Sequence, residues 1–325
     1  MTSKIILSFL TFVFLSTNLA QAQGNASSYY RKIASEQRKI RTKQVNFYKT
    51  ALLYTDQKRL DKGRDMIITQ IKAAQKNMAR TPAYKGDSAI RNDYVRILDI
   101  YMKAYTDGYD SVQVTKARIG DSEKALRQYQ DAFYYMEDFI TEAEDKWALN
   151  EEYFTGYYNV TPMADPTLPS LIIYRQLAAY VQDVRSTYTS VPFEVQKLKE
   201  SIKKKDYDIL EDQRNIMALA AEDAMIAMVV VGNYVYIEPN DEEGEEREDD
   251  YLYGSVIDYL EYIKDAADGD IAEELTKLDE ARYDEDTKKI EKSHEKLLKI
   301  VDDLIQAEAG LNEEIEKFVY DYVEQ

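Results

Sequence analysis

Long stretches of this chain run without glycine or proline, and this feature limits its possible folds more than any other. The 325 residues include only 11 Gly and 6 Pro, and the segments between them are rich in Ala, Leu, Ile, Glu, Lys and Gln. Those residues favour helices, and Gly and Pro are the residues that interrupt them. The sequence therefore predicts an all-α fold, an elongated antiparallel bundle or array of about seven to nine helices with no significant sheet.

Apolar side chains at alternating three- and four-residue spacing mark individual helices. The sharpest run has the spacing of a coiled-coil seam; it consists of Leu126, Tyr129, Phe133, Met136, Ile140, Ala143 and Trp147. A second stripe is rich in tyrosine and consists of Tyr94, Leu98, Tyr101, Tyr105 and Tyr109. Such stripes line cofactor pockets in some proteins, but this periodicity is more typical of a core, and we interpret both stripes as core.

Residues 1–22 have the pattern of a bacterial secretory signal peptide. Lys4 precedes an apolar core from Ile5 to Leu15, and the small-residue pattern Ala20-Gln21-Ala22 follows. The apolar core is about half of the ~20 residues that a membrane-spanning helix needs, so we favour cleavage after Ala22 over a retained anchor. The prediction is an exported protein of the periplasm or outer cell surface of a bacterium, without a transmembrane span after cleavage. Residues 23–325 are expected to form a single all-helical domain.

Cysteine content and net charge exclude several classes of function. The chain has no cysteine, which excludes a disulfide framework, a thiol nucleophile and thiolate metal sites. Its formal net charge of −18 repels phosphate groups, so neither nucleic acid nor an anionic membrane surface is expected as a partner. Basic peptides and divalent cations remain open, and the sequence does not predict an oligomeric state.

The stretch "PAYKGDSAIRNDYVRIL" at 82–98 contains the signals of a helix–helix connection. Pro82 ends the preceding helix, Gly86 allows a tight turn, and Asp87 or Ser88 can cap the next helix. The order Tyr84-Lys85-Gly86-Asp87-Ser88, then Ile90-Arg91-Asn92, then a Tyr-rich helix ending in "YTDGYDSV", resembles a family of uncharacterised, exported, all-helical bacterial surface proteins. The resemblance implies location and fold class, and it implies no activity and no functional residue.

Two short sequences with an Asp-Gly pair look like equivalent corners of the fold. They are "YTDGY" at 105–109 and "AADGD" at 266–270. Corners of similar sequence suggest that a helical unit was duplicated.

A break in the helical pattern near 153–169 carries the candidate binding residues. Gly156 and three prolines crowd into this span, and long loops in compact domains are often functional. Most of the 28 tyrosines are expected in the core or at its boundary. Four aromatic residues are predicted to lie in or beside the break rather than on one helical face. Exposed aromatic rings in such a place can bind proteins or sugars. The candidates are Tyr153, Phe154, Tyr157 and Tyr158.

The residues that ordinary enzyme chemistry requires are scarce. His294 is the only histidine, and with Glu291 it supplies one of the two Glu-x-x-His pairs of di-iron helical bundles. A catalytic triad is not expected either, because His294 is the only histidine that could act as its general base. We therefore predict no catalytic residue, no metal site and no cofactor, and we predict that the protein is not an enzyme. A carboxylate-based hydrolase is the least favoured reading, because Asp and Glu pairs are abundant by chance.

An acidic linker is expected near 238–250, "EPNDEEGEEREDD", as a solvated loop or disordered tether. An EF-hand centred on Gly244 would place Pro239 at its first ligand position, so any calcium binding would be diffuse. The function we favour is an exported non-enzymatic envelope protein with a structural or interaction role, which binds a protein or glycan of the bacterial envelope. The alternative is a small-ligand or divalent-cation binding protein with a site between helices.

Overall fold

The computed structural model describes the backbone of residues 2–54, 56–118, 122–237 and 246–324, with side chains except those of 2–25, 123, 237 and 246. Within these ranges the fold is all-α with one small two-stranded sheet, and 86% of the model is helical. Eight helices result when segments joined by a π turn or a single residue are counted together. The predicted fold class is confirmed. Within the same ranges, no helix combines the length and the apolar content that crossing a bilayer requires.

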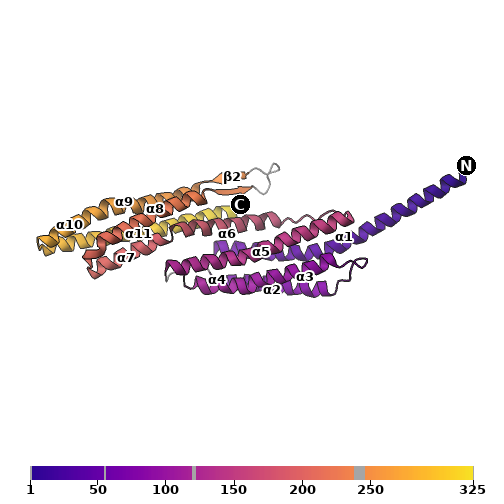
Figure 1. Ribbon diagram of the computed structural model, residues 1–325, viewed down its shortest axis with the longest axis horizontal. Coiled ribbons are helices and arrows are strands. Elements are labelled where there is room, and N and C mark those ends of the chain that lie inside the picture. The colour runs from indigo at the N-terminus through magenta and orange to yellow at the C-terminus, as the bar shows by residue number, and fades with distance from the viewer. Residues whose placement is uncertain (1, 55, 119–121, 238–245, 325) are drawn as a thin grey trace. The chain divides into compact units, whose positions relative to one another are not determined.

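The chain divides into two compact units (Figure 1). Unit 1 comprises Met1–Val114 and Asp131–Leu171, and unit 2 comprises Thr115–Gln130 and Ile172–Gln325. The sequence predicted a single domain from 23 to 325. That prediction concerns folding, which a division by contacts does not test, and it stays a prediction.

Unit 1 is built from four long helices. Its elements are α1 (Thr2–Leu53), α2 (Gln57–Ala79), α3 (Ala89–Lys103), the π turn η1 (Ala104–Gly108), α4 (Tyr109–Lys116) and α5 (Glu123–Tyr158). The end of α4 from Thr115 and the start of α5 up to Gln130 belong to unit 2. α1 packs on α2 and α2 on α3. α5 completes the ring: its Trp147 lies edge-to-face against Tyr94 of α3 with 5.2 Å between ring centroids, and its glutamates bond to α1.

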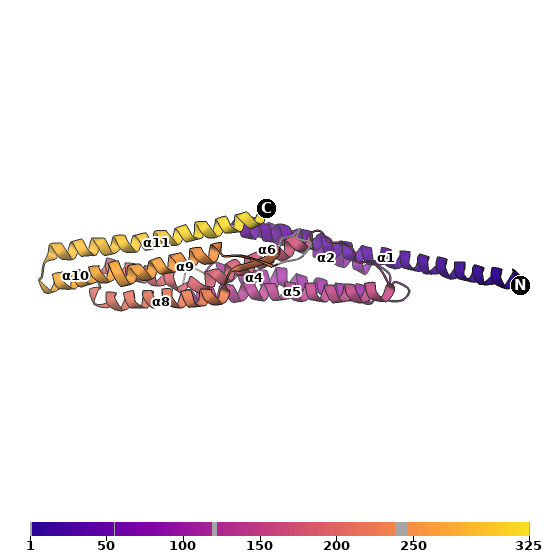
Figure 2. The same ribbon diagram turned by 90° about the horizontal axis from the view of Figure 1, so that it is seen from above.

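Unit 2 repeats this plan with a β-hairpin added. Its elements are α6 (Leu168–Tyr188), α7 (Ser190–Lys204), the 3-10 turn η3 (Tyr207–Ile209), α8 (Leu210–Val231), β1 (Tyr234–Ile237), β2 (Glu246–Asp249), α9 (Tyr251–Ala266), the π turn η4 (Ala267–Ile271), α10 (Ala272–Tyr283) and α11 (Thr287–Val323). α7, α8, α9 and α11 pack in a ring, and α10 and α11 lie side by side in both views (Figures 1 and 2). The hairpin is antiparallel, and its first pair is Tyr234 with Asp249.

The two Asp-Gly sequences are not corners, as the sequence suggested, but π turns inside continuous helices. One connects α3 to α4 and the other connects α9 to α10. Gly108 packs closely on α5, because a Cβ there would lie 3.1 Å from the Cα of Met136, whereas Gly269 has no such neighbour. Close packing therefore favours glycine at the first π turn and does not explain the second.

The same positions are buried in both units, which shows that the units are two copies of one four-helix architecture. The buried residues of α2 pair at constant spacing with those of α8: Leu60 with Leu210, Ile67 with Met217, Ile71 with Ala221, Ala74 with Ala224 and Met78 with Met228. The correspondence continues in α5 and α11, where Ile140 pairs with Leu304, Trp147 with Leu311 and Phe154 with Phe318. These registers support the duplication that the sequence suggested.

The Tyr-rich stripe is confirmed as core, because every member from Tyr94 to Tyr109 is buried. The coiled-coil seam is buried from Met136 to Trp147, whereas its first three members, Leu126, Tyr129 and Phe133, are only half-buried. The acidic linker is partly wrong: residues 246–249 form strand β2 opposite β1 rather than a tether, and 238–245 lie outside the described residues.

Candidate binding surface

The four candidate aromatic residues lie in the last two turns of α5, not in a loop. The predicted loop near 153–169 is therefore wrong for residues 153–158. Gly156 is tolerated inside the exposed part of the helix, and the helix ends only before Asn159, which adopts a left-handed conformation with φ 48°. Because Tyr153 and Tyr157 are one turn apart, they do share a helical face, against the prediction.

The Pro-rich loop 159–167 packs back on its own bundle. The Met163 amide donates to the Tyr30 hydroxyl at 2.8 Å, and Asp165 receives a hydrogen bond of 3.0 Å from Arg41 of α1. Both contacts attach the loop to α1. The loop is thus a structural connection.

Phe154 and Tyr158 point into the bundle and have structural roles. Phe154 is 1% exposed and lies 4.6 Å from the Tyr158 ring and 6.4 Å from the Tyr84 ring. The Tyr158 hydroxyl donates to Asp87 Oδ2 at 2.8 Å, while Asp87 Oδ1 accepts from the Ala89 amide and caps α3. Burial and the hydrogen bond to Asp87 raise the pKa of Tyr158 to about 12.

Unit 2 contains the same aromatic cap. Tyr322 at the end of α11 donates to Asp249 Oδ2 at 2.6 Å, and Asp249 Oδ1 accepts from the Tyr251 amide at the start of α9. The Tyr322 and Tyr234 rings meet edge-to-face at 5.0 Å, as those of Tyr158 and Tyr84 do at 5.2 Å. Since both copies use this arrangement, Phe154 and Tyr158 serve the architecture rather than a binding site.

Tyr153 and Tyr157 point outward and form the candidate surface. They are 63% and 71% exposed, and their rings stack with 6.1 Å between centroids and an angle of 14° between planes. The corresponding residues of α11 are Lys317 and Asp321. The architecture therefore does not require aromatic residues at these two positions.

A groove of about 600 Å³ between α3 and α5 ends at Tyr153. Its lining residues are Asp93, Arg96, Ile97, Asp99, Ile100, Glu142, Lys146, Leu149, Asn150 and Tyr153. Leu149 is largely exposed, and the corresponding residue of α11 is Glu313. Each rim of the groove has an ion pair and therefore both charge signs: Arg96 with Asp93 at 3.0 Å on α3, and Lys146 with Glu142 at 3.6 Å on α5.

Sequence reasoning missed the contribution of Leu149 and Ile100. A signal for it exists, because α5 has a second stripe at three- and four-residue spacing on its outer side. That stripe consists of Tyr135, Phe139, Glu142, Lys146, Leu149 and Tyr153.

A buried polar seam joins α1 and α5 inside unit 1. Glu137, Glu144 and Glu151 recur every seven residues on α5 and accept from Tyr48, Gln37 and Tyr30 of α1, respectively. The corresponding side chains of unit 2 are largely apolar; in α6 and α7 they are Leu177, Val184, Tyr188, Val191 and Val195. On α11 the counterparts of Glu137 and Glu151 are the buried Val301 and Ile315, and that of Glu144 is the half-buried Glu308. The described part of unit 2 therefore keeps one carboxylate of the seam.

Arg41 is the centre of this seam. Its Nε donates to Glu144 at 3.0 Å and its Nη1 to Asp165 at 3.0 Å. Burial is the largest single effect on the pKa of Arg41 and lowers it, but the charge and hydrogen bond of Glu144 together with the hydrogen bond to Asp165 outweigh burial, and the pKa is raised. Burial likewise acts to raise the pKa of Asp165, and hydrogen bonds from Thr167 and Arg41 hold it below its usual value. Both side chains are thus held in their charged forms.

We expect Gln44→Leu to stabilise unit 1. Gln44 is fully buried, and within the described ranges neither atom of its amide has a hydrogen-bond partner. An unpaired buried polar group costs about 1–3 kcal/mol, so an apolar side chain of similar volume should raise the free energy of unfolding by about that amount. Urea unfolding followed by circular dichroism measures the change.

Gln37→Leu is the matched control for this prediction. The Gln37 amide donates to the Tyr101 hydroxyl at 2.7 Å and to Glu144, so its loss should destabilise the protein. If Gln44→Leu destabilises the protein as Gln37→Leu does, Gln44 is not an unpaired residue.

His294 is half-buried at the edge of the core of unit 2. Its Nδ1 is 3.3 Å from the Tyr207 hydroxyl, and burial together with the nearby charge of Lys205 lowers its pKa. In the part of the chain that the structure describes, no three His, Asp or Glu side chains are grouped as metal ligands would be. The acidic loop around Gly244 lies outside the described residues.

Comparison of the chain with protein-family models, with curated proteins and with solved structures gives no match.

Proposed function

We propose that this chain is an exported, non-enzymatic interaction protein of the bacterial envelope, and that unit 1 binds a protein partner at the α3–α5 groove beside Tyr153 and Tyr157. One observation carries the proposal. Two stacked tyrosines are exposed where the second copy of the same architecture has a lysine and an aspartate. Exposed tyrosines that packing does not require are typical anchors of protein interfaces.

The groove favours a protein over a glycan. Leu149 and Ile100 are apolar side chains that a helix or loop can cover, and both rims offer positive and negative groups. Sugar binding uses open aromatic faces, whereas the Tyr153 and Tyr157 rings stack against each other. The arrangement therefore suits a partner with its own apolar side chains and charged rim.

The proposed location is supported by the N-terminal pattern and the composition. Residues 1–22 have the features of a signal peptide, and the chain lacks cysteine. A fold of this length without disulfides must be held by its core, and both units have one. The periplasm and the outer surface both suit such a protein.

Replacing Tyr153 with Lys and Tyr157 with Asp, the residues of the second copy, should abolish binding and leave the fold intact. Both positions are exposed, so stability should change by less than about 0.5 kcal/mol. Loss of two interface anchors should weaken binding at least about tenfold. The measurement is affinity capture from the envelope fraction of the source bacterium, with the mature chain as bait and the bound proteins quantified by mass spectrometry.

Tyr283→Lys is the control, because Tyr283 is also a highly exposed tyrosine but belongs to unit 2. It should recover the same proteins as the unaltered chain. Recovery that is unchanged by the double substitution contradicts the proposed surface. Recovery that is lost after glycosidase treatment assigns the surface to a glycan instead.

A further inference from the structure

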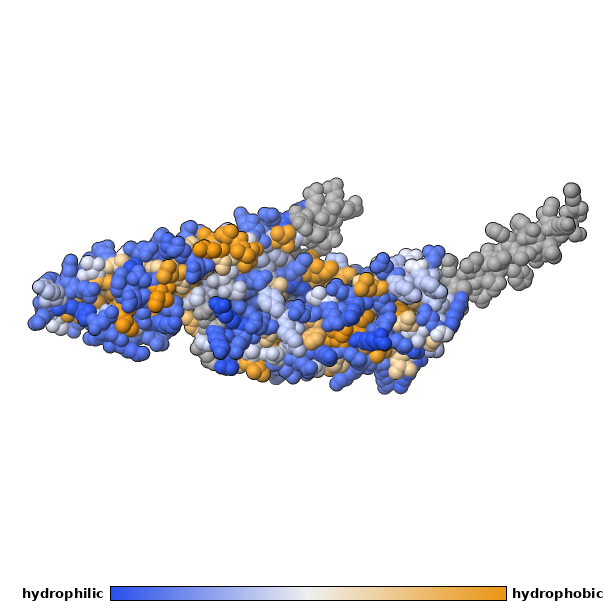
Figure 3. Space-filling view, viewed as in Figure 1, coloured by the Kyte–Doolittle hydropathy of each residue, from blue (hydrophilic) through white to orange (hydrophobic). Residues whose placement is uncertain are grey.

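Helix α8 has an apolar outer face that its own bundle does not cover. Ile216, Leu219, Ile226 and Val230 are all exposed, Val230 by 86%, and Asp223 occupies the middle of the row. Their spacing of three and four residues places them in one stripe along the helix. Figure 3 shows apolar side chains gathered over α8. We call these five residues the α8 stripe.

Folding of the bundle does not require this stripe. The corresponding positions of α2, the equivalent helix of unit 1, are Met66, Thr69, Ala73, Lys76 and Arg80. The inner faces of both helices are buried at the same positions. The same architecture therefore has a largely polar outer face on α2 and an apolar outer face on α8. An uncovered apolar face is typical of an interaction site.

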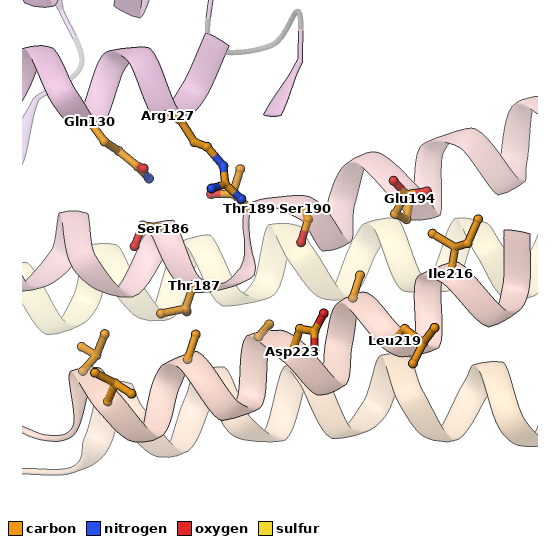
Figure 4. A pocket seen from close by; sticks show the side chains of 15 residues that line it. Arg127, Gln130, Ser186, Thr187, Thr189, Ser190, Glu194, Ile216, Leu219 and Asp223 are labelled. Atoms are coloured by element: carbon orange, nitrogen blue, oxygen red, sulfur yellow. The ribbon is translucent and has the colours of Figure 1, made fainter. Parts of the chain in front are cut away.

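The α8 stripe borders a groove of about 740 Å³ in unit 2 (Figure 4). Its other wall is mainly polar and includes Ser186, Thr187, Thr189, Ser190 and Glu194 of the α6–α7 region, with Arg127 and Gln130 of α5. Unit 1 has a groove of about 680 Å³ between α1 and α2. Three lysines, Lys43, Lys58 and Lys62, are among the side chains that line that groove. Equivalent grooves therefore differ in chemistry, and only that of unit 2 has an apolar helix wall.

Asp223 limits what can cover the stripe. Figure 4 shows its carboxylate directed from α8 toward the α6–α7 junction. No ion pair of a described Lys or Arg with Asp223 is seen, and Arg127 on the opposite wall is not a free cation, because it has an interaction of its own. Burying this carboxylate under a partner without a compensating cation is strongly unfavourable.

A second copy of α8 does not supply that cation. The α8 stripe contains no basic residue, so any pairing of two α8 stripes sets Asp223 opposite its own counterpart or opposite an apolar side chain. Charge complementarity therefore favours a different partner. The regular spacing of the stripe favours a helix, because helices dock through residues at three- and four-residue intervals.

We propose that the α8 stripe binds an amphipathic helix of a partner protein, with apolar residues at three- and four-residue spacing and one Lys or Arg opposite Asp223. This site is separate from the groove beside Tyr153. Apolar residues of the helix cover Ile216, Leu219, Ile226 and Val230, and the basic residue neutralises Asp223.

Fluorescein-labelled peptides of about 20 residues test this site, since a shorter helix is marginal in water. Each peptide has leucines at the stripe spacing and either Lys, Gln or Glu at the central stripe position. Fluorescence anisotropy with the mature chain measures the dissociation constants. We expect the Lys peptide to bind at least about tenfold more tightly than the Gln peptide and the Glu peptide to bind weakest, with the order reversed for Asp223→Lys.

Ile226→Lys introduces the residue that α2 has at this position and should abolish peptide binding. Ile226 is exposed, so the thermal unfolding curve should not change. Lys76→Ala in α2 is the control and should leave peptide binding unaltered. The double substitution at Tyr153 and Tyr157 should also leave it unaltered. A failure of the α8 site is therefore distinct from a failure of the proposed function.

Three results of the peptide experiment overturn the proposal. They are the absence of measurable binding by any peptide, binding that does not depend on the central residue, and binding that survives Ile226→Lys. Sedimentation of the mature chain as a dimer that Ile226→Lys dissociates would also overturn it, because the stripe would then be covered by a second copy.

Discussion

Replacing Trp147 with alanine is expected to lower the free energy of unfolding by about 3–5 kcal/mol, the usual cost of truncating a fully buried large aromatic residue. Trp147 is 1% exposed and lies edge-to-face against Tyr94, where α5 meets α3. The cavity would open in the middle of unit 1, between rings that cannot move together without shifting both helices. Urea unfolding followed by circular dichroism measures the change.

Leu149→Ala, two residues further along α5, is the control and should cost less than about 0.5 kcal/mol because Leu149 is exposed. Trp147→Leu, which introduces the residue of the second copy, should lie between the two. A loss below about 1 kcal/mol for Trp147→Ala would contradict the packing at the α3–α5 contact.

Trp147 also provides a test of the single-domain prediction. It is the only tryptophan, so its fluorescence reports on unit 1, whereas circular dichroism reports on the helices of both units. Coincident unfolding curves in the unaltered protein would show that the units unfold together. Separate curves would show two domains.

The core of each helix could be predicted from the sequence, because burial imposes a period that few other causes produce. Met136 to Trp147 and the stripe from Tyr94 to Tyr109 follow from spacing alone. The outer faces could not be assigned in the same way. α5 and α8 each have apolar residues on two sides, and spacing does not tell which side meets the bundle.

The end of α5 was predicted too early, because Gly156 and the three prolines after it were treated as one break in the helix. A single glycine in an exposed part of a helix lowers stability but does not end the helix. Asn159 was the better signal, since asparagine tolerates the left-handed conformation that follows many helices. The candidate site changed accordingly, from four residues in a loop to two exposed residues on a helix.

The duplication and the hairpin are nearly invisible in the sequence for a physical reason. The copies share buried positions more widely than identical side chains. Between α2 and α8 the buried residues are identical only at Leu60, Ala74 and Met78 and their equivalents. An Asp-Gly pair favours turns, so the sequence alone does not distinguish the π turns at Gly108 and Gly269 from helix ends. Strand β2 has the sequence "ERED", which has no strand propensity and pairs because β1 lies opposite.

The second large effect is expected at Arg41. Arg41→Ala should lower the free energy of unfolding by about 3–5 kcal/mol, because it leaves two carboxylates buried without their cation. The side chains of Glu144 and Asp165 are only 14% and 10% exposed, and their ion pairs with Arg41 are 2.5 Å and 3.0 Å long. The loop that contains Asp165 would also lose a bond to α1.

Arg96→Ala is the matched control. Arg96 also pairs with an aspartate at 3.0 Å, but its side chain is 79% exposed, and exposed pairs contribute less than about 1 kcal/mol. A triple variant in which Arg41→Met is combined with Glu144→Gln and Asp165→Asn removes the charges together. It should recover much of the stability that Arg41→Ala loses, since replacing a whole buried ion network is far less costly than removing one partner.

This triple variant also tests why unit 1 has a polar seam at all. Unit 2 has Tyr188 in place of Arg41 and Val191 in place of Gln44, and both side chains are buried there. If the variant recovers stability and Tyr153 still binds its partner, the seam is replaceable, as unit 2 indicates. If stability recovers but partner binding is lost, Arg41 and the loop that it holds set the position of α5 at the groove. If Arg41→Ala costs no more than Arg96→Ala, the seam is accessible to water and the buried network described above is wrong.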